Sequence, residues 1–320
     1  MATIEQIKSL MRSHFENDNE KFKTIALQIA AHEAKLGHTS SAKDIRDIVQ
    51  NPKYSTKSKI VKLNNRNEML EEKISDFELR DLVVTESISE KIKRIIKEYE
   101  KKELLRKNGL KNRSKFLITG EPGTGKTMSA SVIANELGLT LYVIQLEKLI
   151  TKYMGETSVK LRQVFDFINE VNAVYLFDEF DAIGSDRSLD NDVGEMRRIL
   201  NSFLQYLEND DSHSIIIAAT NNPNILDKAL FRRFDDVFEY KLPDIEQIIN
   251  LYKTKLKGIA PDNLFTEEIF NASIGLNHSD IVKVCEDAIK NSILEDKGIT
   301  KEIIMTFIQD RKELYLYKEA

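Results

Sequence analysis

The 320-residue sequence predicts an α/β fold in which a parallel sheet carries helices on both of its faces. Two observations predict this class. Apolar runs of strand length alternate with segments of helical periodicity between residues 115 and 242. A glycine-rich loop also stands between the first apolar run and the helix that follows it. Because ligands bind at the carboxyl ends of parallel strands, this loop marks the expected binding edge of the sheet.

The glycine-rich loop lies in the stretch KFLITGEPGTGKT, residues 115–127, which contains the complete pattern GxxxxGK[ST]. Its glycines let backbone N–H groups turn towards phosphate oxygens, and the positive end of the next helix adds to that field. Lys126 is expected to bridge the β- and γ-phosphates, and Thr127 is expected to hold Mg²⁺. The residues predicted to bind nucleotide here are Gly120, Glu121, Pro122, Gly123, Thr124, Gly125, Lys126, Thr127 and Met128.

Two later strands end in polar side chains that complete a site for phosphate chemistry. The apolar residues 174–177 are followed by Asp178, a predicted Mg²⁺ ligand, and by Glu179, the predicted general base that activates water. Two adjacent acids on a turn usually serve solvation, but here they follow four apolar residues, which favours a chemical role. Asn221 follows the strand at residues 215–219 and is expected to orient the water or the γ-phosphate, although Asn-Asn-Pro is also a good turn sequence.

Arg232 and Arg233 stand in a short loop before the last strand of the sheet. Neither has an evident partner within one chain. Between subunits, an arginine can reach a neighbour's γ-phosphate and stabilise the charge of the transition state. The alternative is an ordinary surface ion pair.

The chain divides into four predicted segments. Residues 1–51 form a small helical docking or adaptor region, or a packing extension of the main domain, and residues 52–75 form a polar linker. Residues 76–242 form the nucleotide-binding domain, in which one long helix is expected over residues 87–107 and Val83 is a candidate for the adenine pocket. Residues 243–320 form a helical lid.

Composition limits the class of protein. The net charge of −5 argues against a nucleic-acid-coating protein, and the single cysteine excludes an internal disulfide. The first residues lack the apolar core of a signal peptide, and the longest apolar runs are too short to span a bilayer. We therefore expect a cytoplasmic protein.

Together, the phosphate loop, the acidic strand end, Asn221, the paired arginines and the helical lid resemble an AAA+ ATPase. Within that superfamily the chain resembles katanin, spastin and related remodellers, and also bacterial and phage-borne AAA proteins. The segment QLEKLITKYMGETSVKLRQVF, residues 145–165, is similar to the pore loop of that branch. The resemblance implies that Tyr153 grips a polypeptide in a central pore, with Lys152 and Met154 beside it. It also places Tyr252 near the position that contacts the base.

Several positions depart from the family pattern. Asp236 stands where a further basic residue often follows the arginines. His278 lies in GLNHSD, which replaces the usual small-residue turn, and we expect a turn or packing histidine rather than a sensor. Arg197 and Arg198 fall where relatives carry arginines at or beside the subunit interface.

The resemblance implies Mg²⁺-dependent ATP hydrolysis in a homo-oligomeric ring, a hexamer when ATP is bound, which remodels, unfolds or translocates a protein through its pore. A separate protease is a possible partner. The alternative is a nucleotide-gated binding module that switches its affinity for a partner without threading it. A DNA-loading protein is a third reading, which the acidic balance disfavours.

Overall fold

The computed structural model describes residues 69–150, 156–184, 192–223 and 228–316, and near the N-terminus residues 8–9, 13, 19–35, 38, 42–43 and 45–46. The chain forms two compact units, Met1–Asn64 and Asn65–Ala320. In the first unit, helix α2 (Asn19–Lys35) buries Ile25, Ala26 and Ile29, whose spacing places them on one face of the helix. The rest of the predicted helical region lies largely outside the described residues.

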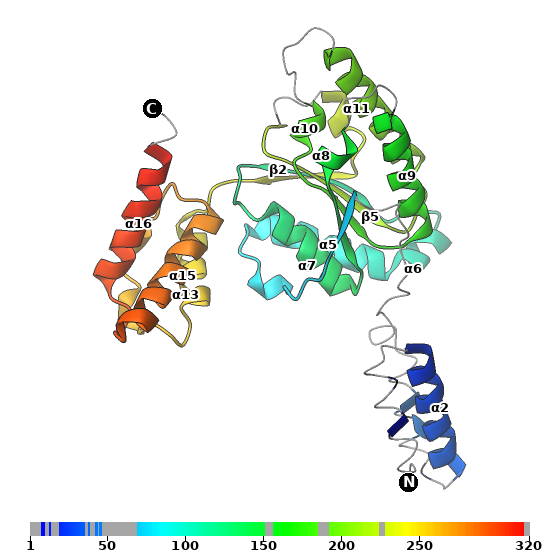
Figure 1. The fold of residues 1–320 in the computed structure, drawn as a ribbon, viewed down its shortest axis with the longest axis horizontal. Coiled ribbons are helices and arrows are strands. Elements are labelled where there is room, and N and C mark those ends of the chain that lie inside the picture. Colours follow the sequence, from blue (N-terminus) through cyan, green and yellow to red (C-terminus); the bar gives the residue numbers. More distant parts are fainter. Residues whose placement is uncertain are drawn as a thin grey trace. The chain divides into compact units, whose positions relative to one another are not determined.

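The described part of the second unit contains one six-stranded sheet in the order β1-β3-β4-β5-β2-β6. Its strands are β1 (Leu70–Lys73), β2 (Lys115–Gly120), β3 (Leu141–Ile144), β4 (Val174–Phe177), β5 (Ile215–Thr220) and β6 (Asp236–Tyr240). Strands β2 to β6 run parallel to one another, as the alternation of apolar runs and helices predicted. Strands β2 and β5 lie side by side, and β6 pairs with the other edge of β2, so the phosphate loop follows an inner strand of the sheet (Figure 1).

Strand β1 corrects the prediction that residues 52–75 are only a linker. It pairs antiparallel with β3, with Leu70 opposite Ile144, and forms an edge of the sheet. Its sequence LEEK shows no apolar alternation because most of its side chains are exposed at that edge. A short polar strand of this kind leaves no periodic signal in the sequence.

Helices cover both faces of the sheet (Figure 1). One face packs against α8 (Leu146–Leu149), α9 (Glu156–Glu170), α10 (Asp181–Gly184) and α11 (Asp192–Asn209), and the other against α5 (Glu86–Glu100) and α7 (Lys126–Leu137). Each central strand contributes alternate side chains to the two cores. For example, Tyr175 and Phe177 belong to the first core, and Val174 and Leu176 belong to the second.

The single helix predicted over residues 87–107 is wrong in one respect, because the chain forms two helices there. Helix α5 ends at Glu100, and α6 (Lys102–Lys107) begins after a turn at Lys101. The buried stripe of α5 runs from Ile88 to Tyr99, whereas α6 buries no residue. Beyond Tyr99 no apolar packing holds the chain to the axis of α5.

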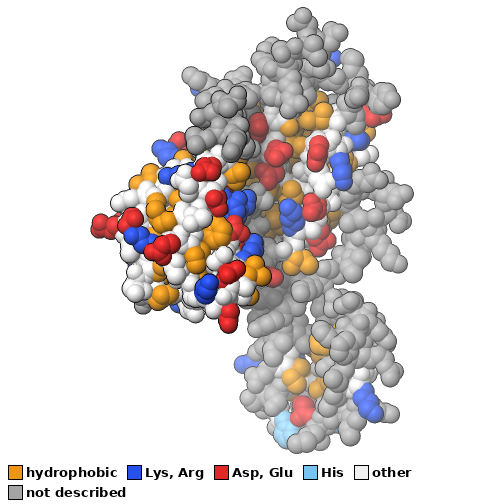
Figure 2. Space-filling model, turned by 60° about the vertical axis from the view of Figure 1, so that its left-hand side comes forward, with side chains coloured by type: hydrophobic (Ala, Val, Ile, Leu, Met, Phe, Trp, Pro, Cys, Tyr) orange, Lys and Arg blue, Asp and Glu red, His pale blue; other side chains and the backbone are white. Residues whose placement is uncertain are grey.

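The C-terminal segment is a helical lid with a core of its own. Its elements are α13 (Ile245–Lys255), the 3₁₀ turn η3 (Asp262–Leu264), α14 (Glu267–Ala272), α15 (His278–Glu295) and α16 (Lys301–Leu316). Short elements η1 (Leu79–Asp81) and α12 (Lys228–Phe231) complete the unit. Figure 2 shows acidic and basic side chains interspersed over the lid surface. None of the helices in the described ranges is both long enough and apolar enough to cross a membrane.

Candidate functional site

The phosphate loop joins the end of β2 to the start of α7, and its backbone requires glycine. Gly120, Gly123 and Gly125 have φ values of +148°, +76° and +102°, in the range that side chains rarely adopt. At Gly120 a Cβ atom would also overlap the carbonyl oxygen of Tyr240 on the neighbouring strand β6. The loop therefore lies tightly against the sheet, and its N–H groups lead directly into the first turn of α7.

Lys126, the first residue of α7, is only 6% exposed. Its Nζ donates hydrogen bonds to the carbonyl oxygens of Gly120 and Glu121, both at 2.8 Å. Burial lowers the pKa of this amine, and carboxylates led by Asp178 partly oppose the shift. The amine is thus held over the loop, where phosphate oxygens can replace the two carbonyls as its acceptors.

The two predicted metal ligands lie in contact. The Oγ1 atom of Thr127 donates a hydrogen bond of 2.7 Å to Oδ2 of Asp178, which directly follows β4. The other carboxylate oxygen of Asp178 accepts the N–H of Glu179 at 2.9 Å. A hydroxyl from α7 and a carboxylate from β4 therefore converge beside the phosphate loop.

Glu179 and Asn221 both line the cavity described below, next to Asp178. Glu179 is exposed and has a left-handed backbone, with φ of +52°. Non-glycine residues in this region are uncommon, and they cluster at functional sites. This conformation turns the chain sharply at the point where β4 ends.

Asp181 is a part of this edge that the sequence reasoning missed. Its Oδ1 accepts the hydroxyl of Thr220 and the backbone N–H of Asn221, each at 3.2 Å. It thereby fastens the end of β5 to the segment after β4 and fixes the backbone of Asn221. The available signal was a third carboxylate in the run Asp178-Glu179-Phe180-Asp181, where Phe180 is a buried anchor.

A cavity of about 520 Å³ opens between the phosphate loop and the lid. Residues 122–128 of the predicted nucleotide-binding stretch line it, whereas Gly120 and Glu121 are not part of its lining. At the other end its walls are more apolar. They include Phe77, Leu82 and the predicted residue Val83 from the segment before α5, and Leu251 and Val282 from the lid. The cavity combines a phosphate end with an apolar end, as a nucleotide requires.

The base contact predicted for Tyr252 is corrected by its position. Its side chain is fully buried in the lid core, and its hydroxyl is hydrogen-bonded to Ser273 at 2.8 Å. The residues of α13 that line the cavity are instead Leu251 and Lys255. Helical periodicity identified the helix, but its rotation towards the cavity depends on how the lid packs.

The lid reaches the phosphate loop through the start of α15. The N–H of Ser279 donates to the carbonyl oxygen of Gly123 at 3.0 Å. Asn277 caps α15, because its side chain accepts the N–H of Asp280. His278, between Asn277 and Ser279, is buried and lines the cavity. The expected turn histidine therefore lies in the wall of the site.

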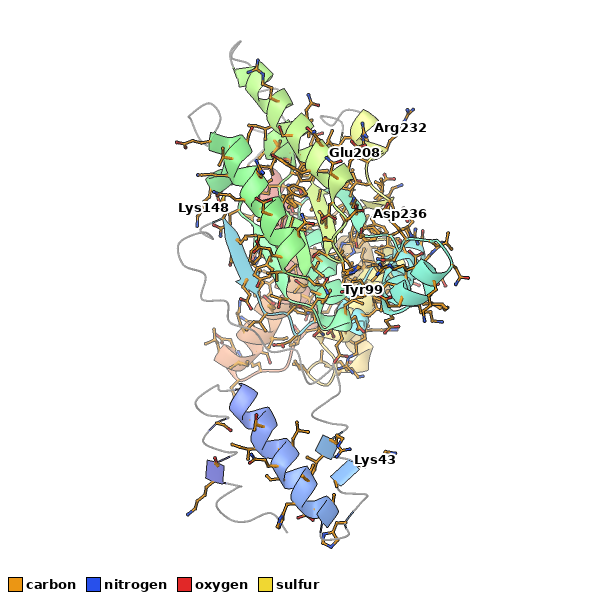
Figure 3. The ribbon with its side chains drawn as sticks, turned by 90° about the vertical axis from the view of Figure 1, so that its right-hand side faces the viewer. Lys43, Tyr99, Lys148, Glu208, Arg232 and Asp236 are labelled. Atoms are coloured by element: carbon orange, nitrogen blue, oxygen red, sulfur yellow. The ribbon has the colours of Figure 1, made fainter. Side chains whose placement is uncertain are left out.

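The predicted arginines lie apart from this cavity, since neither is among the described residues that line it. Arg233 forms an ion pair with Glu208 of α11. Arg232 is exposed at the end of α12, and the described residues offer it no ion pair (Figure 3). Arg198 is also exposed, and the side chain of Arg197 lies outside the described residues. The predicted pore residues Lys152, Tyr153 and Met154 fall between α8 and α9 and also lie outside the described residues.

Comparison with known proteins decides the family. Residues 116–242 match the ATPase family associated with various cellular activities (AAA). Over 309 residues the chain is 32% identical to an AAA family ATPase of Sinorhizobium fredii, with 94% of this chain and 93% of that protein covered. The chain belongs to the AAA ATPase family. The predicted family and the predicted ATP hydrolysis are therefore confirmed.

Two further comparisons place this AAA ATPase among its relatives. It is 31% identical over 217 residues to a proteasome-activating nucleotidase of Methanoregula boonei, covering 65% of this chain and 50% of that protein. The crystal structure of the FIGL-1 AAA domain matches with a TM-score of 0.61 at 22% identity, covering 76% of this chain and 86% of that one. The latter likeness confirms the predicted fold.

Proposed function

We propose that this AAA ATPase binds Mg·ATP in the cavity between its phosphate loop and its lid, and that ATP hydrolysis drives the remodelling or unfolding of a protein substrate. The observation that carries the site is the contact between Thr127 and Asp178, which brings two oxygen ligands from different elements together beside the loop. Oxygen atoms of this kind are the ligands that Mg²⁺ prefers, so the residues fit the ion. When bound, Mg²⁺ neutralises charge on the phosphates.

The remaining residues of the site have separate roles. Lys126 binds the β- and γ-phosphates in place of the two carbonyl oxygens that hold its amine now. Glu179 takes a proton from the attacking water, and Asn221 orients that water from the end of the adjacent strand β5. Asp181 positions Asn221 through its backbone N–H. The left-handed backbone at Glu179 sets the direction in which its side chain leaves the end of β4.

Two substitutions separate binding from hydrolysis. Lys126→Ala should abolish ATP binding, because it removes the buried cation that faces the phosphates. Glu179→Gln should keep ATP affinity and lower turnover by about 10²- to 10⁴-fold, the usual contribution of a general base. ATP binding by calorimetry and phosphate release measure the two effects. Rapid turnover by the Glu179→Gln protein would exclude Glu179 as the base.

We further propose that the protein acts as a homo-oligomer, a hexamer with ATP, in which Arg232 or Arg233 reaches the neighbouring site. Lys152, Tyr153 and Met154 would then grip a polypeptide in the pore. Relatives named as proteasome-activating nucleotidases support a protein substrate and a separate protease as partner. The cytoplasmic location stays a prediction.

Tyr153 distinguishes threading from the alternative of a nucleotide-gated switch. Tyr153→Ala should keep ATP turnover and lose substrate unfolding, because the aromatic grip is separate from the chemistry. The substrate can first be captured in a pull-down with the ATP-locked Glu179→Gln protein as bait and Lys126→Ala as the control bait. Mass spectrometry then identifies the captured protein. A Tyr153→Ala protein with full biological activity would support the switch instead.

A further inference from the structure

His278 is a buried polar residue in the wall of the cavity for which the proposed chemistry has no use. It is the first residue of α15 and is 8% exposed. Neither of its ring nitrogens has a hydrogen-bond partner among the described residues, and both are buried. An imidazole that is buried without partners costs free energy, and such a group in a native structure requires an explanation. A ligand in the cavity would supply the missing partners.

The imidazole is uncharged near neutral pH. Burial lowers the pKa of His278 to about 4, and the carboxylate of Asp244 opposes this shift only in part. Of the other charged side chains that line the cavity, Lys255 and Glu286 lie on the lid, and Lys126, Asp178, Glu179 and Asp81 lie across from it. A neutral imidazole offers one N–H donor and one acceptor nitrogen, which suits hydroxyl groups better than it suits phosphate oxygens.

The position of His278 along α15 indicates which part of a nucleotide it faces. The cavity is lined by His278, Val282 and Glu286, which recur every four residues on one face of the helix. Each step of four residues advances by about 6 Å along the axis. Ser279, the residue after His278, is hydrogen-bonded to Gly123 of the phosphate loop. Val282, in contrast, belongs to the apolar end of the cavity. His278 thus lies between the phosphate end and the base end.

We propose that His278 recognises the sugar of the bound nucleotide, by hydrogen bonds between its neutral imidazole and the ribose hydroxyls. The inference rests on the proposed binding of ATP in this cavity. The phosphates already have Lys126 and the N–H groups of the loop. The base has the apolar wall one helical turn further on. The sugar is the part of the ligand that remains for the imidazole.

The test compares ADP with 2′-deoxy-ADP and 3′-deoxy-ADP, which avoids turnover. Dissociation constants are measured by calorimetry for the full-length wild type, His278→Ala and His278→Gln. One lost hydrogen bond is worth about tenfold in affinity. The wild type should therefore bind ADP about tenfold more tightly than at least one deoxy analogue. His278→Ala should weaken ADP binding by a similar factor and lose this discrimination, and the amide of His278→Gln should restore part of it.

An exposed histidine outside this cavity provides the control. His213 lines a different hollow, with Lys111 and Asp211, so His213→Ala should bind all three nucleotides as the wild type does. The melting temperature of the ligand-free protein gives a second readout. His278→Ala removes an unpaired polar group and should not lower that temperature, whereas loss of an ordinary packing residue would lower it.

Three results would overturn the proposal. One is an equal loss of affinity for all three nucleotides in His278→Ala, which would point to the base or to packing. Another is an affinity for ADP that rises between pH 8 and pH 6 in the wild type but not in His278→Ala. This result would point to a charged contact between His278 and phosphate. The third is unchanged ADP binding by His278→Ala while Lys126→Ala binds none. If Lys126→Ala also kept full affinity, the proposed site itself would be wrong.

Discussion

At the scale of single residues, Gly123 joins the phosphate loop to the lid. Its carbonyl oxygen accepts the N–H of Ser279, and its backbone has a left-handed φ of +76°. A Cβ atom at this position would lie 2.6 Å from Oδ1 of Asn277, the cap of α15. The absence of a side chain therefore permits both the turn of the loop and its contact with the lid.

Gly123→Ala should impair nucleotide binding as well as stability. The left-handed backbone alone costs about 1–2 kcal/mol for a residue with a side chain. The overlap with Asn277 adds about 1–3 kcal/mol of overpacking, or else the lid moves away from the loop. Urea unfolding measures the stability, and titration with ADP measures the binding.

Gly109 offers a matched control for Gly123. Its φ is +74°, but a Cβ atom there would meet nothing within 4 Å. Gly109→Ala should therefore show the backbone cost alone and keep its affinity for ADP. Identical behaviour of the two variants would mean that the contact between Gly123 and the lid does not matter for binding.

Some residues of the site can be predicted from the sequence, and others cannot. Lys126, Thr127 and Asp178 follow from local patterns, because a strand and the loop or turn after it are contiguous in the chain. Leu251 and Asp181 were missed. Leu251 lines the cavity through the packing of the lid, and Asp181 acts across two strands. Both depend on tertiary contacts that leave no local pattern.

At the scale of elements, a network of charges ties α5 to the edge strand β6. Arg113 donates to Asp236 at 2.9 Å and to Glu98 at 3.0 Å, and Lys91 donates to Asp236 at 2.8 Å. Figure 3 labels Asp236, at the start of β6, and Tyr99, at the end of α5. The acidic residue that departs from the family pattern at position 236 thus has a structural role, since it accepts from two cations.

Glu98→Gln should make stability less dependent on pH. Burial raises the pKa of Glu98, but hydrogen bonds led by those of Arg113 more than offset it, so the pKa lies below its ordinary value of 4.5. A carboxylate with a lowered pKa stabilises the folded state above 4.5, and this contribution is lost as the pH falls below that value. At pH 7 the free energy of unfolding of the variant should be about 1–2 kcal/mol below that of the wild type. This value allows for the partial exposure of the network to solvent, which weakens its charge interactions.

Urea unfolding at pH 7 and at pH 4 measures this difference, which should shrink at the lower pH. Glu90 on the same helix forms an exposed ion pair with Lys93. Glu90→Gln should therefore change the stability by no more than about 0.5 kcal/mol. A difference between wild type and Glu98→Gln that stays constant with pH would contradict the assigned role.

Elements with a buried apolar face were predicted well, and those without one were not. Strands β2, β4 and β5 are buried over their whole length or nearly so, and their apolar runs show it. Strand β1 and helix α6 bury few or no side chains, and the sequence predicted a linker and a longer helix in their place. Hydrophobic periodicity reports burial, so exposed elements escape it.

At the scale of the whole molecule, the two arginines lie away from the cavity of their own subunit. Both arginines are exposed, but Arg233 is paired with Glu208. In the proposed ring, Arg232 is therefore the better candidate to reach a neighbouring subunit. A role across the interface can be tested without knowing the geometry of the assembly.

Arg232→Ala should lower ATP turnover by about 10³-fold, the lower range for an arginine finger. Arg233→Ala should have a smaller effect, because Glu208 already engages that side chain. Mixing inactive Arg232→Ala with inactive Glu179→Gln should restore part of the turnover. In a mixed ring, some sites combine an intact Glu179 with an intact Arg232 from the neighbour. A mixture as inactive as its components would exclude a role across subunits.

The separate core of the lid has a consequence for the order in which the second unit folds. The lid core is formed largely by residues 248–308, which are close together in the sequence, whereas the sheet pairs distant segments such as Lys115 with Ile216. Local contacts form faster than distant ones, because less chain entropy is lost in closing the loop between them. The lid should therefore fold early and the sheet late. Since the cavity exists only where the two meet, nucleotide binding is the last property that the folding chain acquires.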